Sequence, residues 1–424
     1  MNLLESEGLR LVHLLKDCAK LTELGNFMDA DIALYHLSRL ASPNGDSMQR
    51  VATYFTEALA CYHMVKNLCG VSKVLSLSKK LSTLEQQLVK QLFFDFYPFL
   101  KIAYLITNQA IFEAMLGDTI INILDLSACD ATQWISLMQG LKELLLPNTP
   151  HPKIIVTAIH EKKQVLDQME LHLRLEAERL NFPFHFNPVV STLENLDPET
   201  LPIKKGEPLA ITCVLQLHSL LATDDVIEMV KIKGQRDFAE MLGKQKKKKK
   251  KMMDLDPSPV SALSPFSPCP SHRMECLLNG LWKLQPKVMV ITEQESSING
   301  CTLTERVDRA LNFYGALFDC LESSISKTMV GRSLMEKMLL GEQIKNIIAC
   351  EGVERKERHE KLETWIPRLE LAGFWMVPIS SNGIMLATKL LQSYVHGYNI
   401  LEDKKSLFIC WKEIPLFSVS AWSS

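Results

Sequence analysis

The sequence predicts an α/β fold in which a mostly parallel sheet is flanked by helices and preceded by a block of helices alone. Three observations predict this arrangement. Apolar residues in the first block recur at the three- and four-residue spacing of helices. After that block, short apolar runs alternate with helix-length segments, which is the pattern of βαβ units. These runs are almost continuously apolar, as in strands covered on both faces.

Residues 1–117 are expected to form a helical cap. Two helices with apolar stripes come first, and a capping box at residues 82–85 begins a later helix. Packing within the chain explains most of the leucines in these stripes, but the same spacing suits packing against a helix of a second chain. The candidate interaction face consists of Leu11, Leu14, Leu34 and Leu37.

Residues 118–233 and 273–424 are expected to form the α/β core in two parts. Helices dominate the stretch 302–371, and the chain ends in a hairpin of two strands at 406–411 and 416–422. The buried strands of the sheet are predicted at residues 119–125, 153–159, 184–190, 208–215 and 287–292.

Residues 234–272 interrupt the core with lysines, prolines and serines, which cannot bury a core, so we interpret the segment as a disordered linker. An unbroken lysine run within it is a candidate nuclear import signal or a weak contact with nucleic acid. A solvated tract without a role is an equally good interpretation, because a pure lysine run has low specificity. The run consists of Lys246, Lys247, Lys248, Lys249, Lys250 and Lys251.

Composition excludes several classes of protein. No apolar run is long enough for a transmembrane helix, and no membrane partner is expected. The 11 cysteines are scattered and contain no CxxC pair, which argues against a zinc finger and against a disulfide framework. The formal net charge of −2 argues against a DNA-binding protein that relies on phosphate contacts alone. We therefore expect contact with DNA only through a partner.

Polar residues follow several predicted strands, and the carboxyl ends of parallel strands meet at one edge of a sheet. His160, Glu161, Gln216, His218, Glu293 and Glu295 could line a pocket there with Asp125 and do acid–base work. The alternative interpretation is that they fix loops and cap helices, and that Asp125 is a hydrogen-bonded structural aspartate. No nucleophile elbow, HExxH pair or P-loop is present, so we expect no enzyme.

Charged residues of both signs fill residues 355–360. We expect this segment to be a helix with a solvated, ion-paired face. A basic patch that contacts a partner is the alternative interpretation.

Five consecutive residues, Ile121, Asn122, Ile123, Leu124 and Asp125, resemble a signature block of the GRAS family of plant transcriptional regulators, Val-His-Ile-Ile-Asp. Asn122 departs from this block by replacing its histidine. Later matches follow in the family's order, so the resemblance spans nearly the whole chain and is closest to the scarecrow-like protein 3 subgroup. These later matches are Gln133, Trp134, Arg355, Arg358, His359, Glu360, Trp365, Gly373, Trp411 and Trp422.

The resemblance implies a single GRAS domain over residues 1–424, with a helical cap on a Rossmann-like core similar to class I methyltransferases. It implies a nuclear transcriptional regulator or co-regulator linked to gibberellin signalling and root development. The implied partners are other GRAS proteins, DELLA-type members included, and zinc-finger transcription factors, in homo- or heterodimers. A cap that begins close to residue 1 favours a co-regulator over a self-sufficient activator.

The turn after Asp125 contains no glycine, although a nucleotide cradle needs close approach of the backbone. We therefore expect no cofactor. The alternative is a small-ligand or S-adenosylmethionine-binding protein, or an enzyme, that uses the crevice at the strand ends.

Overall fold

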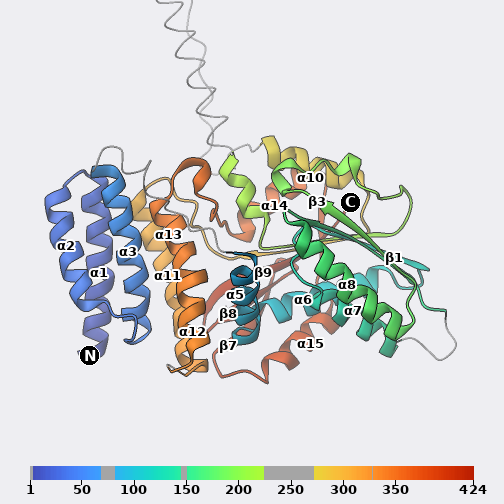
Figure 1. The fold of residues 1–424 in the computed structure, drawn as a ribbon, viewed down its shortest axis with the longest axis horizontal. Coiled ribbons are helices and arrows are strands. Elements are labelled where there is room, and N and C mark those ends of the chain that lie inside the picture. The colour runs from blue at the N-terminus through green and yellow to red at the C-terminus, as the bar shows by residue number, and fades with distance from the viewer. Residues whose placement is uncertain (1–2, 68–81, 145–149, 224–271, 327) are drawn as a thin grey trace, which may run out of the picture.

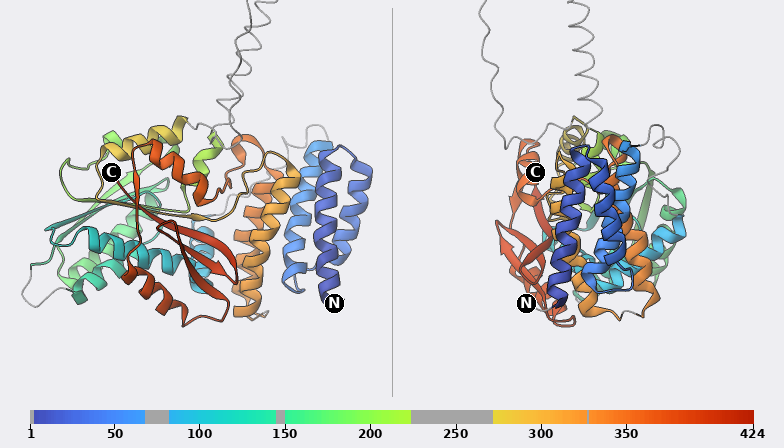
Figure 2. Two further views of the ribbon diagram at one scale, coloured as in Figure 1. Left: turned by 180° about the vertical axis from the view of Figure 1, so that it is seen from behind. Right: turned by 90° about the vertical axis from the view of Figure 1, so that its left-hand side faces the viewer.

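A computed structural model describes residues 3–67, 82–144, 150–223, 272–326 and 328–424. A helical bundle lies at one end of the molecule and a large sheet with its covering helices at the other (Figures 1 and 2). Nearly all of the predicted linker, with its lysine run, lies outside the described residues.

The bundle draws its helices from two distant parts of the sequence. It contains α1 (Leu3–Glu23), α2 (Phe27–Leu40) and α3 (Ser47–Asn67), packed against α11 (Leu303–Ser324) and α13 (Glu342–Ala349) (Figure 1). The later helices of the predicted cap pack elsewhere. They are α5 (Thr83–Phe96), which contacts α12 (Val330–Met335), and α6 (Phe99–Ala114), which packs on the sheet. The predicted capping box is confirmed, since Ser82 and Glu85 cap α5 reciprocally.

The sheet contains all five predicted core strands as parallel neighbours in the order β3-β2-β1-β4-β5. This doubly wound order is that of a Rossmann-like fold, which confirms the predicted fold class. The bounds of the five strands are β1 (Ile120–Asp125), β2 (Lys153–His160), β3 (Phe184–Val190), β4 (Leu209–Val214) and β5 (Val288–Gln294).

Antiparallel strands extend the sheet beyond β5. The predicted terminal hairpin is confirmed as β8 (Ser406–Trp411) and β9 (Ile414–Ser423), and β9 pairs with β5. Two further strands are β6 (Trp375–Val377), which pairs with β9, and β7 (Tyr398–Asp403), which pairs with β8 at the sheet edge. The sequence analysis missed β7, because most of its side chains are exposed and it has no apolar run.

Two apolar cores cover the two faces of the sheet. Side chains of β1 alternate between them, because successive residues of a strand point to opposite faces: Ile123 packs into one core and Leu124 into the other. The first core contains residues of α6, α7 (Thr132–Leu144) and α8 (Lys163–Leu180). The second contains residues of α10 (His272–Lys283) and α14 (Leu362–Leu371).

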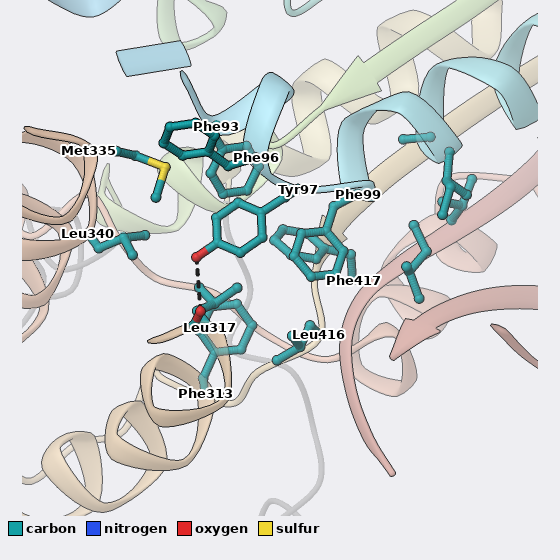
Figure 3. Close-up of a cluster of buried hydrophobic side chains, with 14 of the residues drawn as sticks. Phe93, Phe96, Tyr97, Phe99, Phe313, Leu317, Met335, Leu340, Leu416 and Phe417 are labelled. Carbon is teal, nitrogen blue, oxygen red and sulfur yellow. Dashed lines mark hydrogen bonds between the residues drawn. The ribbon is translucent and has the colours of Figure 1, made fainter. Parts of the chain in front are cut away.

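An aromatic cluster joins the bundle to the sheet (Figure 3). The Tyr97 hydroxyl, between α5 and α6, donates a hydrogen bond of 3.0 Å to the Leu317 carbonyl of α11. The Phe99 and Phe417 ring centroids lie 4.4 Å apart. Buried aromatic pairs of this kind contribute about 0.5–1.5 kcal/mol beyond the area that they bury.

Residues 355–360 are not helical, so the prediction of a solvated, ion-paired helix face is wrong. They form an extended segment between a 3₁₀ turn (Gly352–Glu354) and α14, and Arg358 is 3% exposed. Backbone carbonyls satisfy its guanidinium: Nε donates to the Arg355 carbonyl at 3.0 Å and Nη2 to the Gly352 carbonyl at 2.9 Å. The segment is a buried strap that contacts the interior of its own chain.

Candidate functional site: the crevice at the strand ends

A cavity of about 480 Å³ opens where β4 and β5 end, beneath α5. A second cavity of about 520 Å³ lies beside it, at the ends of β1, β2 and β3. The two share six lining residues, so they form one crevice along the carboxyl edge of the sheet, where doubly wound folds bind ligands. The shared residues are Lys90, Ser127, Gln216, Ser219, Leu339 and Lys356.

The structure brings most of the predicted strand-end residues into this crevice. His160, Glu161 and Gln216 line it, and so does His218. Glu295 does not, because its carboxylate accepts a hydrogen bond from the Leu362 amide at 3.0 Å and lines a separate cavity.

Asp125 lies behind the crevice wall with its hydrogen bonds satisfied. Its Oδ2 accepts from the Trp134 indole at 2.9 Å, and its Oδ1 accepts from the amide and hydroxyl of Ser127 at 2.9 and 3.1 Å. Burial raises the pKa of Asp125, although these hydrogen bonds oppose the shift. Asp125 therefore shapes the loop after β1.

That loop does not fit S-adenosylmethionine or a dinucleotide. Residues 126–130 contain no glycine, and the loop is tied to β4. The Leu126 amide donates to the Thr212 carbonyl at 3.0 Å, and the Ser127 hydroxyl accepts from the Val214 amide at 3.0 Å. Ligand phosphates and ribose need free backbone amides there, so no step of chemistry is derived through such a group.

Two histidines and two glutamates form a cluster at the base of the crevice. His218 Nδ1 lies 2.9 Å from Glu293 Oε2, and His359 Nε2 lies 2.6 Å from Glu357 Oε2. The two imidazoles stack with ring centroids 3.9 Å apart. His359 Nδ1 is buried and has no hydrogen-bond partner among the described residues.

His218, Glu293 and His359 lie close enough together to suggest a metal site, but the ring stacking argues against one. Two imidazoles bound to one tetrahedral zinc hold their ring centres about 5 Å apart, because each nitrogen must point at the ion. The His218 and His359 ring centroids lie only 3.9 Å apart, with the ring planes tilted by 38°, which is closer than that arrangement allows. The cluster is better suited to sharing a proton.

The cluster favours one proton on His218. Burial lowers the pKa of His218, but the Glu293 carboxylate and Glu357 outweigh it, so the pKa is raised. Burial and repulsion by His218 lower the pKa of His359. Burial opposes ionisation of Glu357, but its hydrogen bond from His359 prevails and lowers the pKa. The pKa values of the two histidines are therefore shifted in opposite directions.

The sequence analysis missed Gln294, Lys90 and the aromatic wall of the crevice. Gln294 is 4% exposed and lines the first cavity, and its Oε1 has no hydrogen-bond partner among the described residues. Its position next to Glu293, at the end of a predicted strand, was a usable signal. The wall includes Phe93 of α5 and Phe417 of β9, which only the fold brings together.

The predicted interaction face on the cap requires correction. Leu11 and Leu37 are 2% and 0% exposed, so they pack inside the bundle and cannot contact a partner of the folded chain. Leu14 and Leu34 are half-buried. The apolar side chains that α2 does expose are Met28, Ile32 and Tyr35, at 81%, 56% and 63%.

Several other signature residues make contacts within the chain. The Trp365 indole donates to the Glu360 carbonyl at 3.0 Å, and the Trp411 indole to Asp319 Oδ2 at 2.7 Å. The Trp422 indole donates to the Ser420 hydroxyl at 2.9 Å. Gly373 has a φ of 98° and lies against the ring of Trp282, so a side chain there would be strained.

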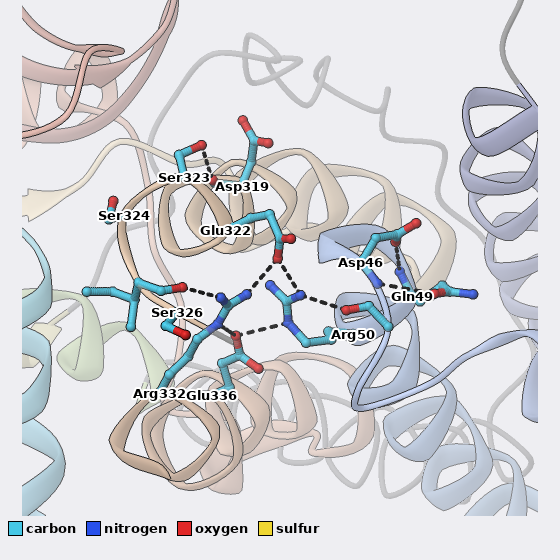
Figure 4. Close-up of polar contacts among 12 residues, drawn as sticks. Asp46, Gln49, Arg50, Asp319, Glu322, Ser323, Ser324, Ser326, Arg332 and Glu336 are labelled. Atoms are coloured by element: carbon cyan, nitrogen blue, oxygen red, sulfur yellow. Dashed lines mark hydrogen bonds and ion pairs between the residues drawn. The ribbon is translucent and has the colours of Figure 1, made fainter. Parts of the chain in front are cut away.

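A network of buried ion pairs joins the bundle to the helices beside the crevice (Figure 4). Arg50 of α3 contacts Glu322 at 2.6 Å and Glu336 at 3.1 Å, and Arg332 contacts the same carboxylates at 2.7 and 3.1 Å. Glu336 begins a π-helical turn (Glu336–Gly341) whose Leu339 lines the crevice.

Comparison with known proteins identifies the family. Residues 11–423 match the GRAS domain family. The chain is 51% identical to GRAS family protein TF80 of Medicago truncatula, covering 99% of this chain and 96% of that protein. It is 44% identical to Scarecrow-like protein 3 of Arabidopsis thaliana (99% and 89%) and 31% identical to DELLA protein RGL1 of the same plant (99% and 70%).

The fold has a crystallographic counterpart. The crystal structure of SCL7 in Oryza sativa superposes with a TM-score of 0.75 at 24% identity, over 97% of this chain and 99% of that chain. In the part of the chain that the structure describes, no helix combines the length and the apolar character needed to cross a membrane.

Proposed function

The chain belongs to the GRAS domain family of plant transcriptional regulators, and from this premise we propose that it acts in the nucleus as a co-regulator. It acts through a protein surface that binds other GRAS proteins, DELLA-type members included, and zinc-finger transcription factors. Gibberellin signalling and root development are the processes that we propose for it. The likeness to both scarecrow-like and DELLA proteins supports this assignment.

The outer face of α2 is the observation that carries the proposal. Met28, Ile32 and Tyr35 lie four and three residues apart, so they form one stripe on the helix. The opposite face of α2 packs inside the bundle, where its residues Ala30, Ala33 and Leu37 are buried. An exposed apolar stripe on a soluble protein marks a contact site for another protein.

A binding experiment with a matched control tests this surface. Ile32→Glu would place a charge in the proposed contact, and desolvating a charge is costly. We expect capture of a purified DELLA-type GRAS protein to fall at least tenfold. Leu171→Glu, on α8 at 56% exposure, is the matched control and should leave capture unchanged. Equal binding by both variants would overturn the role of α2.

Contact with DNA through a partner is tested separately. The purified chain alone should give no salt-dependent gel shift with DNA, but it should join the complex that a zinc-finger partner forms with DNA.

Replacing the six residues Lys246–Lys251 with glutamine in a fluorescent fusion tests nuclear import through the lysine run. Unchanged nuclear accumulation would show that the run has no part in import.

A further inference from the structure

We propose that the 480 Å³ cavity beneath α5 binds an amphipathic small molecule, with an apolar ring body, a hydrogen-bond donor at its inner end and an anionic group at its outer end. The inference goes beyond the proposed function and does not depend on it, since the cavity lies in the core and the proposed protein contact lies on α2.

The size and walls of the cavity fit an apolar body. Pockets of about 300–1,000 Å³ hold ligands of drug size, and this cavity lies within that range. Apolar side chains come to it from several separate segments of the chain, so the fold builds the wall. They include Phe94 of α5, Tyr104 of α6, Leu317 of α11 and Phe417 of β9.

One buried polar atom beside the cavity has no hydrogen-bond partner. Gln294 lines the cavity, and its Oε1 is buried without a partner among the described residues. A buried carbonyl oxygen without a partner is costly and calls for an explanation. A hydroxyl or N–H group of a bound molecule would satisfy it.

The mouth of the cavity favours an anion. Lys90 of α5 lines both cavities and forms no ion pair with the residues that the structure describes. The other lysine there, Lys356, is already paired with Glu194. Asp130 also lines the cavity and remains negatively charged, but the Thr132 amide at the start of α7 offsets part of this charge. Lys90 is thus the available charge.

Two fluorescent probes separate the parts of this proposal. One is 2-anilinonaphthalene-6-sulfonate, which has two ring systems, an N–H donor and a distant sulfonate. The other is N-phenyl-2-naphthylamine, which lacks the sulfonate. With the full chain we expect saturable binding of one sulfonate probe per chain, and weaker binding of the neutral probe.

Three variants test the geometry. Leu339→Trp would fill the cavity, and should weaken both probes at least tenfold. Gln294→Met removes the hydrogen-bond acceptor, so it should weaken the binding of both probes about fivefold. It should not lower the unfolding midpoint, because the buried oxygen that it removes has no partner. Lys90→Gln should weaken the sulfonate probe about fivefold and leave the neutral probe unchanged.

Dyes of this type also bind exposed apolar surface, so Ile32→Ser on α2 is the control. It should leave dye binding unchanged while it weakens protein contacts. Non-saturable dye binding, or binding that Ile32→Ser removes and Leu339→Trp does not, would overturn the cavity proposal. Gln294→Met serves as the test if Leu339→Trp does not fold.

Discussion

Two buried polar clusters of this protein contrast in how fully their hydrogen bonds are made. In the arginine–glutamate network, all three guanidinium nitrogens of Arg332 have partners, and two of the three of Arg50. In the histidine–glutamate cluster, His359 Nδ1 has no partner among the described residues, and neither has Oε1 of Gln294, which lines the same cavity. Three members of this cluster, His218, Glu357 and His359, line the 480 Å³ cavity.

The difference teaches where to look for function in a chain without catalytic motifs. A polar network whose bonds are made within the chain fixes one arrangement of helices. A cluster with unmet bonds at a cavity keeps capacity for a ligand or a proton, at some cost in stability. The four predictions that follow test this contrast, from the largest expected effect to the smallest.

Glu336→Ala should have the largest effect. It leaves two buried guanidinium groups with the single Glu322 carboxylate, and breaking a buried ion pair costs about 3–5 kcal/mol. Urea unfolding would measure the loss. The matched control is Glu57→Ala, since the Glu57 carboxylate lies 3.9 Å from Lys345 and is 61% exposed. A loss below 1 kcal/mol for Glu336→Ala would contradict a structural role for the network.

Leu37→Ala and Ile32→Ala extend the contrast to the two faces of α2. Leu37 is fully buried, so its truncation should lower the free energy of unfolding by about 2–4 kcal/mol. Ile32 is 56% exposed, and its truncation should change the free energy of unfolding by less than about 0.5 kcal/mol. Equal losses in urea unfolding would show that the outer face is covered within the chain.

His359→Gln should be tolerated better than Glu336→Ala. The substitution removes a ring with an unmet nitrogen, while the glutamine amide can still donate to Glu357. We expect a loss of about 1 kcal/mol or less in urea unfolding at neutral pH. A loss as large as that of Glu336→Ala would remove the distinction between the two clusters.

The pH dependence of stability should reveal the protonated histidine. The pKa of His218 is raised in the folded state, so its stabilisation is present below the unfolded value of 6.5 and is lost as pH rises through the folded value. The stability advantage of the native chain over His218→Gln should therefore shrink between pH 6 and pH 9. The lowered pKa of His359 has the opposite effect on stability, so it reduces the net dependence of stability on pH.

His36→Gln is the control for this series. His36 is exposed on α2, outside the cluster, so this variant controls for the general effect of replacing a histidine by glutamine. A stability difference between the native chain and His218→Gln that stays constant from pH 6 to pH 9 would show that His218 does not carry the proton.

Much of the fold could be predicted from the sequence because local signals were strong. Five continuous apolar runs gave the core strands, and the capping box at Ser82 marked the start of α5. The strand-end rule brought His160, Gln216 and His218 to one crevice. These patterns are local, or follow from a general property of parallel sheets, so no knowledge of packing was needed.

The errors arose where distant segments decide the outcome. Residues 355–360 have the charge pattern of a solvated helix, but Asn346 Oδ1 accepts hydrogen bonds from the amides of Lys356 and Glu357 and holds the backbone extended. Leu37 and Ile32 are both apolar residues of one amphipathic helix, and only the bundle decides which is covered. The strand β7 pairs through its backbone and has no apolar run.

The sequence by itself determined the five core strands, the parallel sheet and the absence of a glycine cradle after Asp125, because these depend on residue type and spacing along the chain. Only the tertiary structure decided that His218 stacks on His359, that Gln294 faces a cavity without a partner, and that α2 keeps one apolar face in solvent. These properties depend on which residues distant in sequence meet, and burial then sets their protonation and their free hydrogen-bonding capacity.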